Sequence, residues 1–406
     1  MSVQVTPQHV GRDALDEALA SLNLGDAESE IRRRVRAVVE TEVAPRAQAV
    51  DAASSFPADS YQALAKAGLA GLSMPVELGG SGHSMVAYCV AMEEIAAACG
   101  ATSTVYMTQM HCAHPILLQG TKIQHDLYIP GLCNGSLYGS LAVTEAGAGS
   151  DVAAMRTVAR RDGDDYVLNG NKTFITTGDR ADVIVLFASV DRDRGRHGIT
   201  AFLVPRGAAG LSTGRVLGKL GLRGSSTAEL FLDDCRIPAS SRLGDEGSGY
   251  DLSIRSVVKS RMSAAAQGVG FARAAYQAAA LWAANHGLLS GSRRDAQDAQ
   301  FLLADLRTEV LAARQVLYAT ADLVDKAKTD PVTEVAMCKL RCTDVGVDVS
   351  FRAMDLLGAD GDLVELGVER IARDARATQI YDGTNQVQRL LIARDIRLRL
   401  EERPSQ

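Results

Sequence analysis

Asp382 stands where a carboxylate could act as a base, directly before Gly383 and Thr384 near the end of the chain. Apolar residues at helical spacing follow it and predict a helix that begins close to Asp382. The positive end of a helix dipole favours the charged form of a nearby carboxylate. An ordinary acidic residue at a helix start has the same pattern, so this feature alone is a weak sign of catalysis.

A second candidate segment runs from Ala142 to Asp151 and reads AVTEAGAGSD. Its two glycines and small residues would let backbone N–H groups approach an anion or a flat ring closely. A tight surface turn explains the same residues equally well.

A third segment, residues 169–178, places Phe174 two positions before Thr176. Residues two apart on a β-strand share one face, so this pair could cover a flat ring and hydrogen-bond its edge. A core phenylalanine beside a surface threonine is the alternative. Within the same segment, the Asn-Gly-Asn run at 169–171 predicts a hairpin turn.

Composition excludes several classes of function. The chain has 406 residues, 47% of them hydrophobic, and a formal net charge of −6, which argues against binding to nucleic acid. The first 25 residues lack the basic and apolar regions of a signal peptide, and no apolar run is long enough to span a membrane. Seven scattered cysteines indicate reduced thiols in a cytoplasmic protein. His111, Cys112 and His114 are crowded, but their spacing matches no known metal pattern, so we expect no metal site.

The pattern of apolar residues changes twice along the chain. Helical spacing extends from about Glu28 to Leu118 and returns from about Ser253 onward, and short β-branched runs fill the region between. This order differs from the alternating strands and helices of a dinucleotide-binding sheet. We expect four parts, namely an N-terminal extension, an N-terminal helical domain, a middle β domain and a C-terminal helical bundle, at residues 1–27, 28–137, 138–243 and 244–406.

The candidate segments at 142–151, at 169–178 and around Asp382 occur in the same order in the acyl-CoA dehydrogenase family. This chain resembles that family over nearly its whole length. A further matching segment is 219–227, KLGLRGSST, followed by FLDDCRIP at 231–238. The resemblance implies an α+β, mainly α fold with an N-terminal helical domain, a middle β-barrel-like domain and a C-terminal four-helix bundle. It also implies FAD as cofactor, a homotetramer, an acyl thioester carried by CoA or a carrier protein as substrate, and electron-transfer flavoprotein or another acceptor as partner.

The resemblance also assigns roles to particular residues. Asp382 would remove the α-proton while a hydride leaves the β-carbon for flavin N5. The residues expected to contact FAD are Leu141, Val143, Thr144, Gly149, Ser150, Phe174, Ile175, Thr176, Thr384 and Gln386. The residues expected to contact substrate are Ser150, Ser260, Arg261 and Gly383.

The chain departs from the family pattern at the base itself. The usual residue is glutamate, whereas Asp382 is one methylene shorter, and Ser260 occupies the alternative base position. A displacement of about 1 Å can cost ~10²-fold in rate if nothing compensates for it. Val258 replaces an aspartate that would contact the pantetheine arm, which puts free CoA as the carrier in question.

Two further departures concern the FAD pyrophosphate. The segment 286–292, HGLLSGS, replaces the usual Arg-x-x-Phe-Gly-x-Pro stretch, and Asp355 replaces a glutamine. Arg293 or Arg294 would be the substitute for the missing positive charge.

Three alternatives stay open at this point. One is an acyl-carrier-protein dehydrogenase of secondary metabolism. Another is a nitroalkane-oxidase-like flavin oxidase, because Ser260, Asp382 and Arg389 match the positions used by that branch. The third is a binding or assembly subunit with little flavin.

Overall fold

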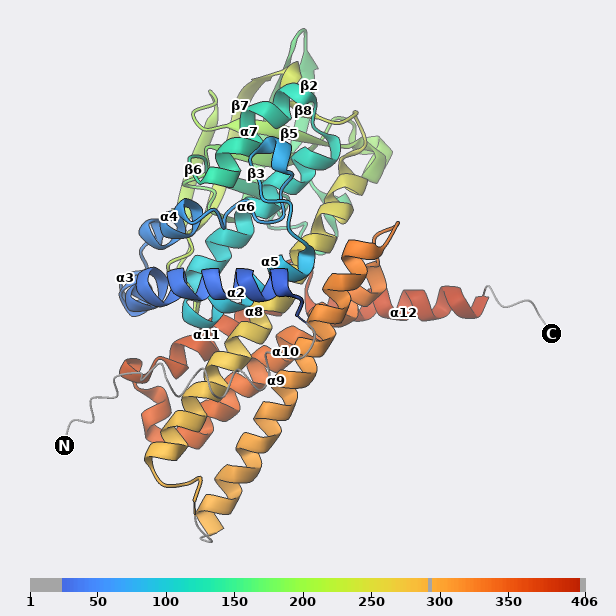
Figure 1. The fold of residues 1–406 in the computed structure, drawn as a ribbon. Helices are drawn as coiled ribbons and strands as arrows, with labels where there is room; N and C mark the ends of the chain where they lie inside the picture. The colour runs from blue at the N-terminus through green and yellow to red at the C-terminus, as the bar shows by residue number, and fades with distance from the viewer. Residues whose placement is uncertain (1–23, 291–293, 402–406) are drawn as a thin grey trace.

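A computed structural model of the protein describes residues 24–290 and 294–401. In chain order, helices both precede and follow one region that contains the strands. Figure 1 shows the sheet at one end of the molecule and the longest helices at the other end. The expected α+β, mainly α fold is confirmed. No helix in the described ranges is both long and apolar enough to cross a membrane.

The N-terminal part is a cluster of helices around two buried ones. Its elements are α2 (Asp26–Val38), α3 (Ala47–Ala53), α4 (Ala58–Lys66), α5 (Met85–Ala98), α6 (Gly100–Gln119) and α7 (Lys122–Asn134). In α2, Ile31 and Val35 are buried one turn apart, as expected for an amphipathic helix. α6 is buried on all sides along most of its length, so its hydroxyl residues must be satisfied internally: Thr104 and Thr108 donate to backbone carbonyls one turn earlier.

The middle part is an eight-stranded sheet with the order β6-β7-β3-β2-β4-β5-β8, in which β1 pairs with β4 in parallel. Its strands are β1 (Gly139–Ala142), β2 (Val158–Asp162), β3 (Asp165–Thr176), β4 (Val183–Ser189), β5 (Ile199–Pro205), β6 (Leu211–Val216), β7 (Thr227–Pro238) and β8 (Arg242–Leu243). The expected hairpin turn at 169–171 is wrong, because these residues lie inside β3 and the β2–β3 turn falls at Gly163. Gly170 instead sits at a register shift with φ of 147°, and a side chain there would collide with Thr157.

The C-terminal part is a helical bundle. Its helices are α8 (Gly249–Asn285), α9 (Arg294–Lys326), α10 (Val332–Leu357), α11 (Val368–Thr378) and α12 (Asn385–Glu401). α8 and α10 cross closely because both have glycine at the contact: a Cβ on Gly346 would lie 2.8 Å from the carbonyl oxygen of Gly268. α12 projects away from the bundle (Figure 1).

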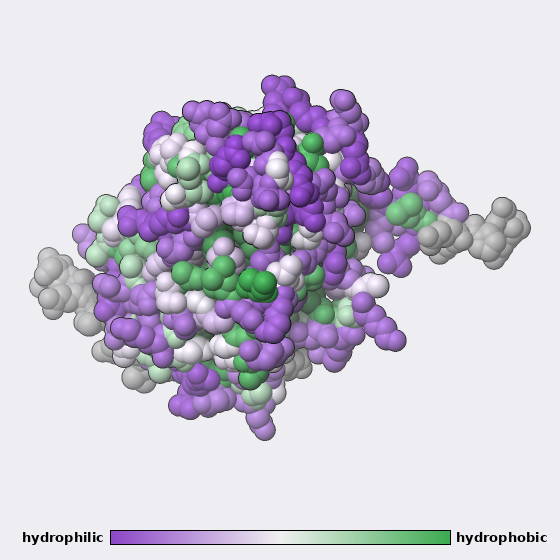
Figure 2. All heavy atoms as spheres, turned by 90° about the horizontal axis from the view of Figure 1, so that it is seen from above, coloured by the Kyte–Doolittle hydropathy of each residue, from purple (hydrophilic) through white to green (hydrophobic). Residues whose placement is uncertain are grey.

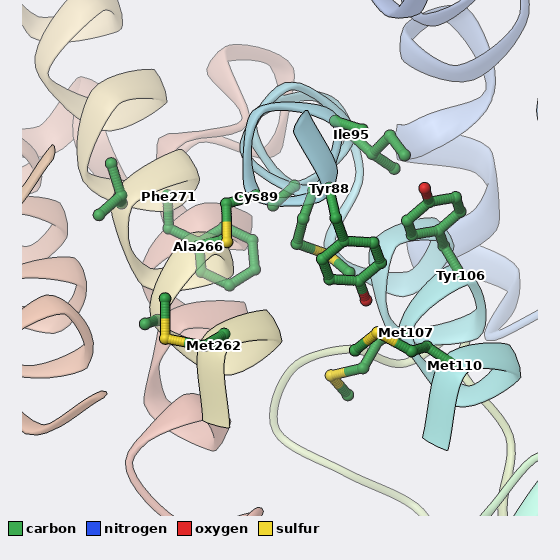
Figure 3. Packing of buried hydrophobic residues seen from close by; sticks show 14 of the residues in the cluster. Tyr88, Cys89, Ile95, Tyr106, Met107, Met110, Met262, Ala266 and Phe271 are labelled. Carbon is green, nitrogen blue, oxygen red and sulfur yellow. The ribbon is translucent and has the colours of Figure 1, made fainter. Parts of the chain in front are cut away.

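One continuous core joins the two helical parts. Where α5, α6 and α8 meet, Cys89 of α5 lies near Met262 and Ala266 of α8 (Figure 3). The rings of Tyr88 and Tyr106 stack at 5.7 Å between centroids, and the Tyr88 hydroxyl lies 2.9 Å from Ser263 Oγ. The helices around the candidate base are therefore fixed by packing.

Buried charges connect the same helices. Glu94 of α5 accepts hydrogen bonds from Arg32 of α2 and Arg273 of α8, each at 2.8 Å. Its neighbour Glu93 accepts one from the hydroxyl of Tyr318 in α9 at 2.6 Å. Because an uncompensated buried charge is costly, this cluster holds α2, α5, α8 and α9 in one arrangement.

All seven cysteines are free and buried. The surface is mostly hydrophilic in the view of Figure 2, but apolar side chains appear on the projecting arm at the right, which is α12. Leu390, Ile396 and Leu400 on this helix are 70%, 55% and 60% exposed. These apolar side chains lack a covering surface among the described residues.

Candidate active site

The loop between α11 and α12 presents Asp382 in a strained conformation. Asp382 and Gly383 both have positive φ, 56° and 88°. A non-glycine residue holds this conformation only where the surroundings impose it. Strain at this position marks the loop as a candidate functional element.

Several buried side chains impose the conformation through the loop's backbone. Lys339 Nζ donates to the Gly383 carbonyl at 3.0 Å and to Asn385 Oδ1 at 2.7 Å. Gln388 Nε2 also donates to the Gly383 carbonyl, at 2.7 Å, and Arg261 Nε donates to the Asp382 carbonyl at 3.3 Å. The loop is thus tied to α8, α10 and α12 at once.

A separate polar chain fixes Tyr381, the residue before the candidate base. Its hydroxyl donates to Gln267 Oε1 at 2.6 Å, and Gln267 Nε2 donates to Ser103 Oγ at 2.8 Å. This chain links the loop through α8 to α6. Sequence reasoning found neither Gln267 nor Lys339, because only the folded chain brings them to the loop.

The Asp382 carboxylate is partly enclosed, with 14% of the side chain exposed. Its Oδ2 atom is buried without a hydrogen-bond partner among the described residues. His111 Nε2 of α6 lies 3.9 Å from this oxygen, beyond hydrogen-bond distance. A carboxylate that is accessible on one side and unsatisfied on the other is free to take a proton.

Burial shifts the pKa of each basic group around Asp382. Burial lowers the pKa of Lys339 to about 8, although the Asp382 carboxylate opposes that shift. Burial likewise lowers the pKa values of Arg261 and His111, again against the effect of Asp382. Lys339 and Arg261 therefore supply positive charge at neutral pH, while the imidazole of His111 is neutral.

The predicted substrate residues lie in three places, namely the Asp382 loop, α8 and the loop after β1. Gly383 and Arg261 lie together at the loop, and Arg261 Nη1 is buried without a partner in the described part of the chain. Ser260 is buried, and its hydroxyl donates to the Val257 carbonyl of its own helix at 3.0 Å. Ser150 is exposed, in the loop that follows β1.

The predicted cofactor residues after β1 form a short hairpin turn. Glu145 and Ala148 exchange two backbone hydrogen bonds at 3.1 Å, and no atom lies near the position where Gly147 would carry a side chain. The Glu145 carboxylate accepts 2.8 Å and 3.0 Å hydrogen bonds from Lys172 Nζ and the Thr157 N–H. A buried ion pair thus fixes the turn that follows Thr144.

Phe174 and Thr176 lie at the end of β3. Phe174 has a φ of 57° and is 65% exposed, while the Ile175 side chain packs in the sheet core, so only the backbone of Ile175 is available to a ligand. Thr176 is partly exposed. The Thr173 N–H donates to the Thr144 carbonyl at 2.9 Å, which joins this end of β3 to the turn after β1. An exposed aromatic ring on strained backbone next to that turn fits the flat ring system of a flavin.

The predicted cofactor residues at the start of α12 line a cavity, Thr384 directly before the helix and Gln386 in its first turn. Thr384 and Gln386 border a volume of about 240 Å³ together with Arg376 and Arg389, whose guanidinium groups suit an anionic ligand. Of the two arginines proposed for the pyrophosphate, Arg293 lies outside the described residues, and so does the side chain of Arg294. His286 stacks on Trp282 at 4.1 Å between ring centroids.

The segment 219–227 docks on α11, which leads into the Asp382 loop. Asp374 accepts a hydrogen bond from the Leu222 N–H, and Arg373 donates to the Leu220 carbonyl at 3.1 Å. Burial raises the pKa of Asp374 to about 6. This contact joins the sheet to the helix that positions the candidate base.

Comparison with known proteins assigns the family. The N-terminal, middle and C-terminal domains of the family described as acyl-CoA dehydrogenase match residues 25–136, 140–235 and 247–397. The mitochondrial short-chain specific acyl-CoA dehydrogenase of Mus musculus is 38% identical over 375 residues, which cover 92% of this chain and 90% of the relative.

Solved structures agree with that assignment. Butyryl-CoA dehydrogenase from Megasphaera elsdenii is 31% identical with a TM-score of 0.88, covering 92% of this chain and 99% of that chain. A chain from the structure of the electron transferring flavoprotein of Acidaminococcus fermentans is 33% identical with a TM-score of 0.88, at 92% and 99% coverage. The chain belongs to the acyl-CoA dehydrogenase family, and it is an FAD-dependent oxidoreductase that acts on the CH–CH group of an acyl-CoA.

Proposed function

We propose that Asp382 is the base that removes the α-proton of the acyl-CoA. The observation that carries this proposal is a carboxylate that is 14% exposed and held in a left-handed loop, with Oδ2 unsatisfied among the described residues. A base must accept a proton without first giving up other hydrogen bonds, and this carboxylate meets that condition.

The surrounding charges suit the product of proton removal. Before the reaction the negative charge is on Asp382, and afterwards it is on the enolate oxygen of the substrate. Lys339 and Arg261 lie next to the loop and stabilise the charge in both places, so the transfer costs little electrostatic energy.

The backbone of the loop also offers a donor. The N–H of Asp382 forms no hydrogen bond within the described ranges. We propose that it donates to the thioester oxygen and thereby makes the α-proton more acidic, as an oxyanion-hole donor does. Lys339 and Gln388 hold the neighbouring Gly383 carbonyl and so keep this N–H in place.

Bound FAD supplies the acceptor for the hydride of the β-carbon. Phe174 and Thr176 would lie against the flavin ring, and Thr384 and Gln386 would contact the cofactor from the N-terminal end of α12, beside Arg389. The full proposed set is Leu141, Val143, Thr144, Gly149, Ser150, Phe174, Ile175, Thr176, Thr384 and Gln386. For the substrate we propose Ser150, Ser260, Arg261 and Gly383, with the unpartnered Nη1 of Arg261 free to meet a substrate oxygen.

The test is Asp382→Asn, which keeps the size of the side chain and removes its ability to accept a proton. The variant should bind FAD and be bleached by dithionite, whereas anaerobic bleaching by butyryl-CoA should slow by on the order of 10³-fold. Asp162→Asn, which alters an exposed ion pair with Arg236 in the sheet, is the matched control. Bleaching of Asp382→Asn by butyryl-CoA at the normal rate would refute the assignment of Asp382 as the base.

The carrier and the acyl group need a second experiment. We propose CoA thioesters with short acyl chains, because the relatives named above are short-chain and butyryl-CoA dehydrogenases. Val258 is 1% exposed and packs in the core, so it offers the pantetheine arm no polar contact. CoA and an acyl-carrier protein both present this arm, so Val258 does not decide between the two carriers. Bleaching rates with matched butyryl-CoA and butyryl-carrier-protein decide between them. Oxygen consumption with nitroethane would indicate an oxidase.

We further propose an electron transferring flavoprotein as the electron acceptor, on the basis of the related chain from Acidaminococcus fermentans. A homotetramer is supported by the exposed apolar side chains of α12, which a second subunit would cover. Seven buried free thiols support a reducing, cytoplasmic location. Reoxidation by the purified flavoprotein, light scattering and cell fractionation test these three points.

A further inference from the structure

His111 and Asp382 present two unsatisfied atoms to each other across the active site. His111 Nε2 and Asp382 Oδ2 are 3.9 Å apart, and their side chains are 9% and 14% exposed. Neither atom has a hydrogen-bond partner among the described residues. Buried polar atoms in folded proteins are paired in the great majority of cases, so this pair of exceptions needs an explanation.

The separation points to a direct contact. A bridging water needs a hydrogen bond of about 2.8 Å to each atom, which a gap of 3.9 Å accommodates poorly. A movement of roughly 1 Å brings the two atoms within the range of an N–H···O hydrogen bond. One small side-chain rotation would therefore satisfy both atoms.

The other groups near Asp382 have a partner or a proposed role elsewhere, since the unpartnered Nη1 of Arg261 is the atom proposed to meet a substrate oxygen. Lys339 of α10 and Arg261 of α8 donate to backbone carbonyls of the loop. Tyr88 of α5 forms its hydroxyl hydrogen bond with Ser263. In the described part of the chain, His111 of α6 is left as the group that faces the carboxylate oxygen itself.

We propose that His111 is the positioning residue for Asp382, with its Nε2–H donating to Oδ2 so that Oδ1 is directed at the α-carbon of the substrate. This rests on the proposed role of Asp382 as the base. An anchored carboxylate compensates for a side chain one methylene shorter than glutamate, because the oxygen that reacts no longer rotates freely.

The protonation state of His111 suits this role. Burial lowers its pKa, and the nearby Asp382 carboxylate opposes that shift only in part. A neutral imidazole has one N–H, which the proposal assigns to Nε2. Such a ring donates a hydrogen bond from Nε2 and keeps its proton.

The experiment compares three variants by anaerobic stopped-flow bleaching with butyryl-CoA across pH. His111→Leu removes the donor at similar volume, His111→Gln keeps an N–H donor, and His114→Leu is the matched control. His114 is on the same helix, is equally buried and also has an unpartnered ring nitrogen, but no contact joins it to Asp382.

We expect His111→Leu to slow bleaching by on the order of 10- to 100-fold. The acid limb of its pH profile should move to higher pH, because a hydrogen bond to a carboxylate lowers its pKa and the variant lacks that bond. His111→Gln should recover most of the rate and the normal pH profile. His114→Leu should match the parent enzyme in both, and all three variants should retain FAD and dithionite bleaching.

Two results would overturn the proposal. One is His111→Leu with an unchanged rate and acid limb. The other is a rate loss with no shift of the acid limb and no recovery in His111→Gln, which would mean that His111 serves packing alone. If His111→Leu fails to load FAD, His111→Met takes its place as the variant without an N–H donor. Its bleaching rate and acid limb are then compared with those of His111→Gln. Retained bleaching by Asp382→Asn would instead refute the base, which separates the two failures.

Discussion

The buried ion pair between Lys172 and Glu145, beneath the turn that follows Thr144, gives the sharpest test of how this site is supported. Lys172 is 1% exposed, and its Nζ donates to Glu145 Oε1 at 2.8 Å and to the Val143 carbonyl at 3.0 Å. Glu145 also accepts hydrogen bonds from the N–H groups of Arg156 and Thr157, at 2.6 Å and 3.0 Å. The perturbation is Lys172→Met, which keeps the length of the side chain and removes its charge.

The expected cost follows from these contacts. Removing one partner of a buried pair typically costs about 3–5 kcal/mol of unfolding free energy, because the other charge is left uncompensated. Two backbone N–H groups still hold Glu145, so we expect the lower end, about 3 kcal/mol. The double variant Glu145→Gln/Lys172→Met leaves no charge buried and should cost about 1–2 kcal/mol. The two single changes are therefore expected to be strongly non-additive.

The assay is urea unfolding of the FAD-loaded protein at one fixed protein concentration, with the rate of FAD release measured in parallel. Lys122→Met is the matched control, since Lys122 and Asp126 are 2.6 Å apart but 85% and 53% exposed. That exposed pair should contribute less than about 1 kcal/mol. A stability of Lys172→Met within about 0.5 kcal/mol of the parent would refute the reasoning, and so would a double variant as unstable as the sum of the singles.

Two further predictions concern groups around the Asp382 loop. Lys339→Met removes the donor to Gly383 and Asn385, so the loop should shift and bleaching by butyryl-CoA should slow by on the order of 10²-fold; an unchanged rate would contradict this. Burial raises the pKa of Asp374 in the folded protein to about 6, above its ordinary value of 3.8. The folded state therefore binds more protons than the unfolded state between these pH values, and the stability of the protein falls as pH rises through them. Asp374→Asn should abolish that fall and be more stable than the parent at pH 7, by urea unfolding at pH 5 and pH 7.

The sequence predicts the helix–sheet–helix order because hydrophobic periodicity is a local property. It failed at 169–171, where Asn-Gly-Asn has the composition of a turn but Gly170 serves a register shift inside a strand. Positive φ is needed in both structures, and composition alone does not distinguish them. The neighbours across the sheet, here Thr157, make that choice.

The sequence predicts only those residues of the candidate site that carry a local pattern. Asp382, Gly383 and Arg261 carry a sequence pattern, and the structure brings these three together. His111 and Lys339 come from helices far away in sequence, and their role depends on contacts that form only on folding. The crowding of His111, Cys112 and His114 in the sequence matches no metal pattern, and nothing local relates His111 to Asp382.

The seven buried thiols allow local opening of the fold to be measured by their reaction with an added reagent. Burial raises the pKa of Cys112 in α6 to about 12, and those of Cys133 in α7 and Cys235 in β7 to about 11, so none is a reactive thiolate at neutral pH. An alkylating reagent can reach each one only when the surrounding element opens. The alkylation rate of each cysteine, resolved by peptide mass, would therefore measure how often the element around it opens, without any engineered label.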